Sequence, residues 1–348
     1  MEYRKLGRTG LEVSAIGLGT EHLVRQTETM EEVLRSAVEA GVNYMDLVWT
    51  LAEFWDPFGP ALRRYRDKFA LAVHWSSNDR FDIDWARRHF DDNLLRVGND
   101  YAEIGMITMI DTEFTWNEWT PKSLEYLQKY RKQGRIGVIG MSTHQGAMAT
   151  RAARSGLFDV VMTPISIAQH RCTEYQGLYD ACEEEGIGLV AMKVYNGGTL
   201  CFSGGRMQTI TPVQCLHYVL SQPVSSTVPG AKTVAEYQAT LQYLKASDAE
   251  RDYEGMFAHV DQDLQGQCVY CNHCLPCPQG IDIGRVNKMV DTGQYHPREE
   301  IMSEYMSLPA KASACIECGD CMARCPYEVD VIAKMRKAVK MYEAETMK

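Results

Sequence analysis

The chain has 348 residues, 45% of them hydrophobic, and a formal net charge of −10. This length predicts one large and one small domain. The negative charge, with no basic stripe to offset it, argues against nucleic acid as a partner, and no apolar run is long enough to cross a membrane. Acidity of this size suits docking with a basic protein, although it is also a common solubility feature.

Residues 1–245 predict alternating strands and helices. The strands are expected in short β-rich runs at 12–18, 42–47, 69–74, 104–110, 136–141, 160–163, 188–193 and 224–228. Amphipathic segments between the strands predict helices, for example at 30–40, 85–95, 122–133, 145–155, 177–185, 212–220 and 234–244. Four of these segments end at a glycine, as helices commonly do: Gly41, Gly134, Gly156 and Gly186. Eight such units predict a (β/α)8 TIM barrel, with a doubly wound open sheet as the alternative.

Beyond residue 250 the pattern changes to two cysteine runs. The first consists of Cys268, Cys271, Cys274 and Cys277, followed by a proline. The second consists of Cys315, Cys318, Cys321 and Cys325, also followed by a proline. Runs of this kind are typical of two-cluster ferredoxins. We therefore predict an α/β protein with the barrel over residues 1–250 and a small ferredoxin-like iron–sulfur domain over 251–348.

The spacing also predicts how the cysteines are shared between two 4Fe-4S clusters. Three cysteines of a run hold one cluster, and the fourth holds the other. Because the gap before Cys277 is two residues and not three, its allocation stays open. Two zinc ions are a minority alternative, since zinc sites usually consist of separated C-x2-C pairs.

Disulfides are disfavoured for these cysteines. They need an oxidising compartment, and residues 1–14 are charged with no apolar core of a secretory signal, so a cytoplasmic location is expected. The remaining cysteines are scattered and are expected to be buried free thiols: Cys172, Cys182, Cys201 and Cys215.

Five phrases resemble the aldo-keto reductases in chain order. They are MEYRKLGRTGLEVSAIGLGT at 1–20, GVNYMD at 41–46, GRIGVIGMS at 134–142, GLVAMKVYNGG at 188–198 and VPGAK at 228–232. A bacterial and archaeal branch of this family carries a ferredoxin-like tail, as this chain does. The resemblance implies the barrel fold and the reduction of carbonyls with a nicotinamide cofactor, through an Asp, Tyr, Lys, His tetrad.

Most of that tetrad is replaced. The family's Asp corresponds to Asp46, but the Tyr position is Leu51, the Lys position is His74 and the His position is Thr108. His74 with Asp46 could form an acid–base pair in which the carboxylate orients the imidazole. The competing interpretation is a relic pocket with a satisfied polar pair. Trp49 and Trp75 could stack on a planar ligand, although plain packing is favoured.

The cofactor positions implied by the resemblance are also altered. Ser142, Gly230 and Lys232 remain as candidate cofactor-binding residues. Met162 replaces the Gln that lies under the nicotinamide, and Glu236 falls near the Arg that holds the 2′-phosphate. A carboxylate there would repel a phosphate, so binding of NAD(P)H is uncertain, and NAD is favoured over NADP.

Two functions of different classes follow. The first is an iron–sulfur oxidoreductase that couples electron transfer through two clusters to reduction or oxidation of a small molecule in the barrel mouth, with a redox partner protein. Asp46 and His74 would be its catalytic residues. The second is a non-catalytic electron-transfer or scaffold protein with a degenerate barrel. A conventional NAD(P)H-dependent reductase is a weaker third option.

Overall fold

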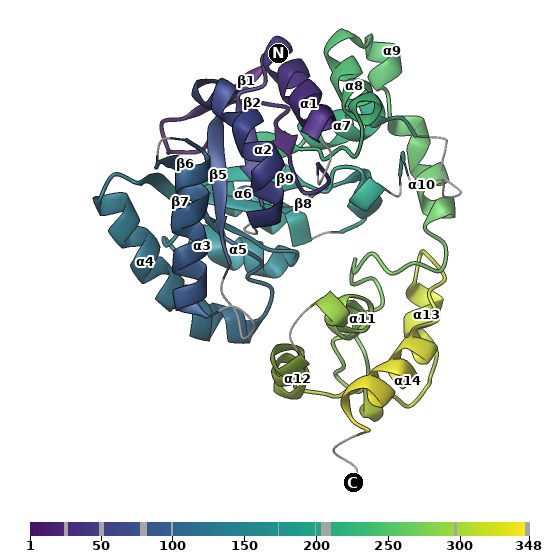
Figure 1. Cartoon of the computed structure of the whole chain (residues 1–348). Helices are drawn as coiled ribbons and strands as arrows, with labels where there is room; N and C mark the ends of the chain where they lie inside the picture. The colour runs from purple at the N-terminus through teal and green to yellow at the C-terminus, as the bar shows by residue number, and fades with distance from the viewer. Residues whose placement is uncertain are drawn as a thin grey trace.

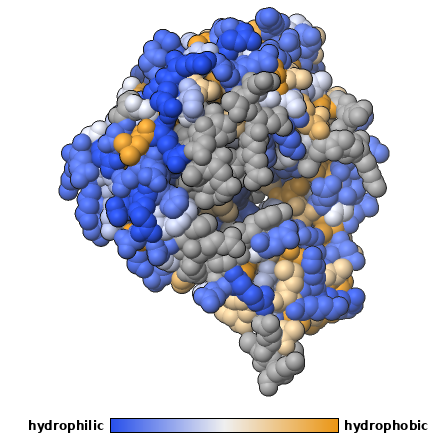
Figure 2. Space-filling view, viewed as in Figure 1, coloured by the Kyte–Doolittle hydropathy of each residue, from blue (hydrophilic) through white to orange (hydrophobic). Residues whose placement is uncertain are grey.

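The computed structural model of the chain describes residues 1–23, 27–48, 52–76, 82–98, 100–172, 174–198, 200–202, 210–295 and 298–344. Figure 1 shows an upper barrel, which contains the N-terminus, and a lower helical domain near the C-terminus. On the face in Figure 2, hydrophilic residues dominate over the barrel's helices, whereas apolar residues are more frequent over the lower domain. None of the described helices is long and apolar enough to span a membrane.

The barrel wall is one parallel sheet of eight strands in chain order. The strands are β3 (Leu18–Gly19), β4 (Tyr44–Leu47), β5 (Ala70–Trp75), β6 (Ala102–Ile107), β7 (Ile136–Ser142), β8 (Val160–Pro164), β9 (Gly188–Met192) and β10 (Ser226–Val228). Parallel bridges pair Ile16 with Thr227 and Gly19 with Gly230. These bridges join the first and last strands, so the sheet closes and the predicted (β/α)8 barrel is confirmed.

Helices cover the outside of the barrel (Figure 1). They are α1 (Thr27–Glu39), α2 (Ala52–Tyr65), α3 (Ile83–Arg96), α4 (Thr120–Lys132), α5 (Gly146–Arg154), α6 (Glu174–Glu185), α7 (Pro212–Leu220) and α8 (Val234–Leu241). The glycines after α1, α4, α5 and α6 have φ between 65° and 81°, which is the left-handed conformation expected after a helix end.

The barrel interior is filled with apolar side chains below its carboxyl-terminal mouth. These are Tyr44, Ala72, Ile104, Met106, Val160, Met162, Val190 and Val228. The antiparallel hairpin of β1 (Tyr3–Lys5) and β2 (Glu12–Ser14) closes the opposite end, where Arg8 N donates to Gly186 O at 2.7 Å, just before β9. The strand ends at the mouth are therefore the open face, as in other TIM barrels.

The lower domain follows two short helices, α9 (Asp248–Arg251) and α10 (Phe257–Asp263). It contains α11 (Ile283–Thr292), α12 (Arg298–Ser307), α13 (Asp320–Arg324) and α14 (Val331–Tyr342). Helices α11 and α14 pack together through buried apolar residues such as Val286, Met335 and Ala338. Both cysteine runs lie beside this helix pair, in loops apart from Cys321, which is in α13.

Candidate active site and metal centres

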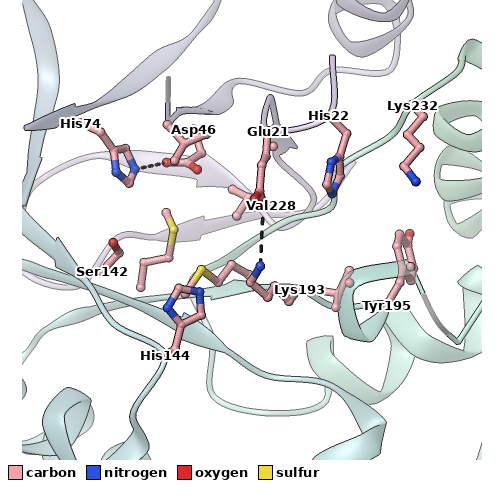
Figure 3. Close-up of a pocket in the computed structure, with 18 of the residues that line it drawn as sticks. Glu21, His22, Asp46, His74, Ser142, His144, Lys193, Tyr195, Val228 and Lys232 are labelled. Atoms are coloured by element: carbon pink, nitrogen blue, oxygen red, sulfur yellow. Dashed lines mark hydrogen bonds and ion pairs between the residues drawn. The ribbon is translucent and has the colours of Figure 1, made fainter. Parts of the chain in front are cut away.

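A pocket occupies the mouth of the barrel (Figure 3). Its lining comes from the carboxyl-terminal ends of the strands, including Asp46, His74, Thr108, Ser142, Met162, Lys193 and Gly230. Met109 and Lys193, which also line it, have φ of 54° and 55°. Left-handed backbone in residues other than glycine is uncommon and concentrates at functional sites.

Asp46 and His74 form a buried pair, as the sequence predicts. His74 Nε2 lies 2.8 Å from Asp46 Oδ1, and the imidazole is 2% exposed. On the other side of the ring, Nδ1 lies 2.9 Å from Thr108 Oγ1. Ser76 Oγ donates to Thr108 Oγ1 at 3.1 Å. The four side chains make a continuous hydrogen-bonded chain from Asp46 to Ser76.

This chain accommodates either protonation state of His74. A neutral ring donates from Nε2 to Asp46 and accepts from Thr108 at Nδ1, whereas a protonated ring donates at both nitrogens. Since both nitrogens are already engaged, the imidazole does not present a free nitrogen to a ligand. Thr108 is only half-buried and lines the pocket, so its hydroxyl is the group through which a proton could pass between His74 and a ligand.

None of the described tyrosines replaces the missing tetrad residue beside Asp46. Tyr44 precedes Asp46 on the same face of β4, but it is fully buried in the barrel interior and does not line the pocket. Tyr195 does line the pocket, but its hydroxyl lies 2.8 Å from Thr240 Oγ1 and is thus engaged. The Tyr position itself, Leu51, lies outside the described residues.

Trp75 packs inside the protein, which is the interpretation that the sequence favoured. Trp75 is fully buried and stacks on Tyr126 at 5.6 Å between ring centroids, so it packs against the helix layer and does not face a ligand. Trp49, the other candidate, lies outside the described residues.

A second carboxylate–imidazole pair lies at the same mouth. Asp111 accepts from Thr143 Oγ1 at 2.8 Å and from the His144 backbone N at 2.6 Å, and its Oδ2 lies 2.9 Å from His144 Nδ1. Burial alone would raise the pKa of Asp111, but the charge and hydrogen bonds of His144, together with the Lys288 charge, hold that pKa well below its usual value. Asp111 follows β6 and His144 follows β7, so this pair joins the ends of two adjacent strands; it was not predicted from the sequence.

The eight clustered cysteines divide into two groups of four, each lining its own cavity. The inner cavity, nearer the barrel, is lined by Cys268, Cys271, Cys274 and Cys325. The outer cavity is lined by Cys277, Cys315, Cys318 and Cys321. Each group takes three cysteines from one run and the fourth from the other. The structure thus places Cys277 with the second run, despite the shorter gap that precedes it.

The two runs share one backbone conformation. The second and fourth residues after the first cysteine have positive φ in both, at Tyr270 (57°) and Asn272 (62°) and at Glu317 (56°) and Gly319 (84°). Alternation of this kind turns backbone N–H groups toward the concave side of a loop, where they favour an anionic group. A cage bound by four thiolates fits that environment.

A single metal ion fits these cavities less well. Over the described residues, no three His, Cys, Asp or Glu side chains converge as the ligands of one ion would. Thiolates on one zinc ion lie about 2.3 Å from it and would be gathered tightly. Cysteines that surround a cavity without converging favour the larger iron–sulfur cage over the zinc alternative.

Helix α11 connects the inner cavity to the barrel pocket. Asn287, 1% exposed, donates from Nδ2 to Cys268 Sγ at 3.4 Å. The next residue, Lys288, donates from Nζ to the carbonyl oxygen of His144, and its charge acts on Asp111. His144 also lines the barrel pocket. Two adjacent residues of one helix therefore contact a cluster cysteine and a pocket residue.

The loop after β8 provides a second connection. Arg171 forms an ion pair with Asp261 of α10, and His170 Nε2 lies 3.3 Å from the same carboxylate. Cys172 Sγ lies 3.6 Å from the carbonyl oxygen of Val269, which stands between two cysteines of the first run. These contacts connect the barrel to the segment that leads into the inner cavity.

The fold, the strand-end pocket and the cysteine cavities agree with the comparisons. The Aldo/keto reductase family matches residues 15–214, more than half of the chain. The chain belongs to the aldo/keto reductase family. A 4Fe-4S dicluster domain matches residues 267–332 of this aldo/keto reductase and contains all eight clustered cysteines.

Relatives of this aldo/keto reductase are distant. YqkF, an uncharacterized oxidoreductase of Bacillus subtilis, is 22% identical over 313 residues, covering 76% of this chain and 98% of its own. L-galactose dehydrogenase of Arabidopsis thaliana is 25% identical over 222 residues, covering 59% and 68%. The holo form of the aldo-keto reductase AKR11C1 from Bacillus halodurans superposes with a TM-score of 0.61 at 19% identity, covering 75% and 96%, which shows the fold alone.

These matches confirm the predicted family, fold and oxidoreductase character. The domain boundary at residue 250 and the roles of the individual site residues stay predictions.

The family's nicotinamide cofactor fits this aldo/keto reductase poorly at its phosphate end. The Lys232 backbone N, a donor that would face a phosphate, instead donates to Glu236 Oε2 at 2.7 Å. Ser142 Oγ accepts from Met109 N at 3.0 Å, but its hydroxyl can still donate. The side chains of Ser142 and Lys232 both line the pocket, so only the backbone donor of Lys232 is already taken. The Glu236 carboxylate thus already accepts from the Lys232 backbone N, and its negative charge would repel a 2′-phosphate at that position.

The scattered cysteines of this aldo/keto reductase largely match their prediction as buried thiols. Cys172, Cys182 and Cys215 are buried, whereas Cys201 is only half-buried and its Sγ lies 3.6 Å from Cys215 Sγ. Burial raises the pKa of Cys182 to about 12. A thiol with that pKa is almost fully protonated and unreactive near neutral pH.

The Asp111 pair gives a first stability prediction. Asp111→Asn should destabilise the barrel by about 1–3 kcal/mol, because a neutral amide is a weaker acceptor than the carboxylate for the donors of Thr143 and His144. This corresponds to a melting temperature lowered by roughly 2–12 °C. Since the pKa of Asp111 is lowered by folding, its contribution is complete above about pH 4 and is lost as the pH falls below that value.

Thermal unfolding at pH 7 measures this effect, with Asp100→Asn as the matched control. Asp100 pairs with Arg135 at the surface, where such pairs contribute at most about 1 kcal/mol. Equal shifts for the two variants would contradict the importance of the Asp111 pair.

Proposed function

We propose that this protein is an iron–sulfur oxidoreductase that exchanges electrons between its C-terminal domain and a small molecule held in the barrel pocket. Cys268, Cys271, Cys274 and Cys325 would hold one 4Fe-4S cluster, and Cys277, Cys315, Cys318 and Cys321 the other. When bound, such clusters supply one-electron transfer. The protein's own part is to hold the ligand at the barrel mouth and to move the accompanying protons.

The observation that carries this proposal is the bridge made by α11. Asn287 contacts Cys268, and Lys288 contacts His144 of the pocket. A scaffold that only displayed an electron-transfer module would have no need to join a cluster ligand to a polar pocket through two adjacent residues. The bridge therefore favours transfer within the chain over the degenerate-barrel alternative.

Proton movement is assigned to the chain of Asp46, His74 and Thr108. A ligand that gains electrons also takes up protons, and Thr108 can donate at the pocket surface while His74 restores its proton. Asp46 stabilises the protonated ring and fixes its orientation. The pocket thus has an acid–base group although the family's tyrosine is absent.

An anaerobic experiment tests the proposal before the substrate is identified. Dithionite-reduced protein, freed of excess reductant, is mixed with small carbonyl and conjugated-alkene compounds, and the return of the oxidised cluster absorbance is followed. A compound that reoxidises the protein at the pocket should do so more slowly in His74→Ala. If every compound reoxidises both proteins at one rate, the scaffold function is favoured instead.

Conventional hydride transfer should be nearly absent. The family's proton donor is replaced at Leu51, and Glu236 takes the backbone donor of Lys232. General acid catalysis contributes about 10²–10⁴-fold, so reduction of a generic aldehyde with NADPH should be close to background. Absorbance of NADPH measures this rate. Robust turnover that survives loss of the clusters would restore the conventional reductase as the function.

A further inference from the structure

Two imidazoles of the barrel pocket are bonded to carboxylates, but they differ in what they offer a ligand. His74 is 2% exposed, and its two ring nitrogens are hydrogen-bonded to Asp46 and Thr108. The His144 side chain is 28% exposed and lines the pocket (Figure 3). Its Nδ1 contacts Asp111, whereas its Nε2 has no hydrogen-bond partner in the described part of the chain. Of the two rings, His144 is the one that leaves a nitrogen free for a ligand.

Asp111 determines which nitrogen of His144 exchanges a proton. Because the pKa of Asp111 lies well below its usual value, its side chain is a carboxylate and can only accept hydrogen bonds. His144 Nδ1 is therefore the donor in their 2.9 Å contact. In the neutral ring Nε2 then carries a lone pair, and in the protonated ring it carries a proton. The nitrogen without a partner is thus the one that gains and loses the proton.

Further contacts hold His144 in place without occupying that nitrogen. The His144 backbone N donates to Asp111 Oδ1 at 2.6 Å, and its carbonyl oxygen accepts from Lys288 Nζ of α11. Thr143 Oγ1 donates to the same Asp111 oxygen at 2.8 Å. His22 also lines the pocket, but no hydrogen bond or ion pair of the described residues orients its ring. Since a catalytic group is most effective when its geometry is fixed before the ligand arrives, His144 is the better candidate.

Three polar side chains form one edge of the pocket, at the ends of two adjacent strands. Thr108 follows β6, Ser142 ends β7, and His144 lies two residues beyond Ser142. Met109 N donates to Ser142 Oγ, which joins the two strand ends and leaves the Ser142 hydroxyl able to donate to a ligand. This edge therefore presents hydroxyl donors on either side of one backbone hydrogen bond, together with an imidazole nitrogen.

The rest of the lining favours a neutral ligand with an apolar body. The lysines and glutamates that line the pocket are equal in number: Lys193, Lys232, Glu21 and Glu236. Many of the other lining side chains are apolar: Met109, Met162, Met192, Val194, Phe202 and Val228. Pockets of this kind bind small molecules through apolar contact and use a few polar groups to orient them. A carbonyl group placed at the polar edge would meet the donors there.

We propose that His144 is a second catalytic acid of the pocket, donating from Nε2 to a neutral ligand whose double bond is polarised by a carbonyl group. Complete reduction of that bond adds two electrons and two protons; the π bond breaks and two bonds to hydrogen form. One proton comes from His74 through Thr108, and the other comes from His144. The reduced C-terminal domain loses the two electrons, and both imidazoles regain their protons after the product leaves. This inference rests on the proposed function, which supplies the electrons.

Reoxidation of the dithionite-reduced protein tests this role with two acceptors. Ferricyanide takes one electron and no proton, whereas cinnamaldehyde, a neutral conjugated carbonyl compound, takes two of each. His144→Gln should slow reoxidation by cinnamaldehyde about 10²–10⁴-fold, the usual contribution of a general acid, and leave the ferricyanide rate within about twofold. His259→Gln, at an exposed histidine of α10, is the control and should change neither rate. Added imidazole should restore the cinnamaldehyde rate of His144→Ala about tenfold.

A second measurement needs no turnover. Diethyl pyrocarbonate modifies unprotonated histidine nitrogens, and mass spectrometry of the peptides should show His144 modified, as exposed His259 is, and His74 protected. Protection of His144, equal cinnamaldehyde rates for wild type and His144→Gln, or an equal loss of both rates in that variant would overturn its role as an acid. An unreactive wild type with cinnamaldehyde would overturn the ligand class. Absence of dithionite bleaching would instead refute the clusters and hence the proposed function.

Discussion

Anaerobically purified protein should contain about eight irons, and Cys318→Ala should retain about four. Cys318 lies in the outer cavity with Cys277, Cys315 and Cys321. Loss of one thiolate there should release the outer cluster while the inner four cysteines keep theirs. Because metal binding supplies folding energy in small metal-bound domains, the C-terminal domain should also become more sensitive to proteolysis. Iron and sulfide analysis, with the visible spectrum, measures the loss.

Cys182→Ala is the control for this substitution. Cys182 is buried in α6, far from both runs in sequence, and should leave the iron content unchanged. Cys325→Ala adds a test of the allocation, because Cys325 lines the inner cavity although it belongs to the second run. The Cys325→Ala variant should lose the inner cluster and keep the outer one. Stoichiometric zinc without sulfide in the wild-type protein would refute the iron assignment altogether.

The barrel could be predicted from local patterns because each strand and its following helix carry their own signal. Seven of the eight wall strands lie where β-rich runs were expected, within a few residues, and α7 has the predicted bounds. Helix α2 was missed because Pro57, Gly59 and Pro60 lie within it and argue against a helix. The strand predicted at 12–18 instead contains β2 of the hairpin and only the first residue of β3. Strands of two or three residues are too short to show a clear alternation of apolar and polar side chains, so the sequence pattern did not separate them.

The site was only partly predictable, because pairing across the mouth depends on tertiary geometry. Asp46 and His74 could be paired from their positions at adjacent strand ends. Asp111 and His144 also follow adjacent strands, so the same rule could have paired them; the contact of Lys288 with His144 could not be predicted, because Lys288 comes from a helix 144 residues further along the chain. Likewise, the sequence placed Glu236 near the phosphate position but did not show that its carboxylate already accepts from Lys232 N.

His74→Ala should reduce turnover by about 10²–10⁴-fold with the native electron donor, while iron content and fold are kept. In the proposed reaction the imidazole supplies the proton, but its two nitrogens are hydrogen-bonded to Asp46 and Thr108 and do not reach the ligand directly. We therefore expect Thr108→Val to cause a loss of similar size, because valine keeps the shape and removes the hydroxyl that passes the proton. Asp46→Asn should cost less, since an amide oxygen can still accept from Nε2. Rates of cluster reoxidation by a pocket ligand measure all three.

Thr163→Val is the matched control for the Thr108 substitution. Thr163 is fully buried on β8, and its hydroxyl has no hydrogen-bond partner among the described residues, so the same change there should leave turnover within about twofold. If Thr108→Val keeps full activity while His74→Ala loses it, the proton leaves the imidazole by another path, through Asp46. If both variants keep full activity, the Asp46–His74 pair is structural, the chemistry of the barrel lies elsewhere, and the scaffold function gains support.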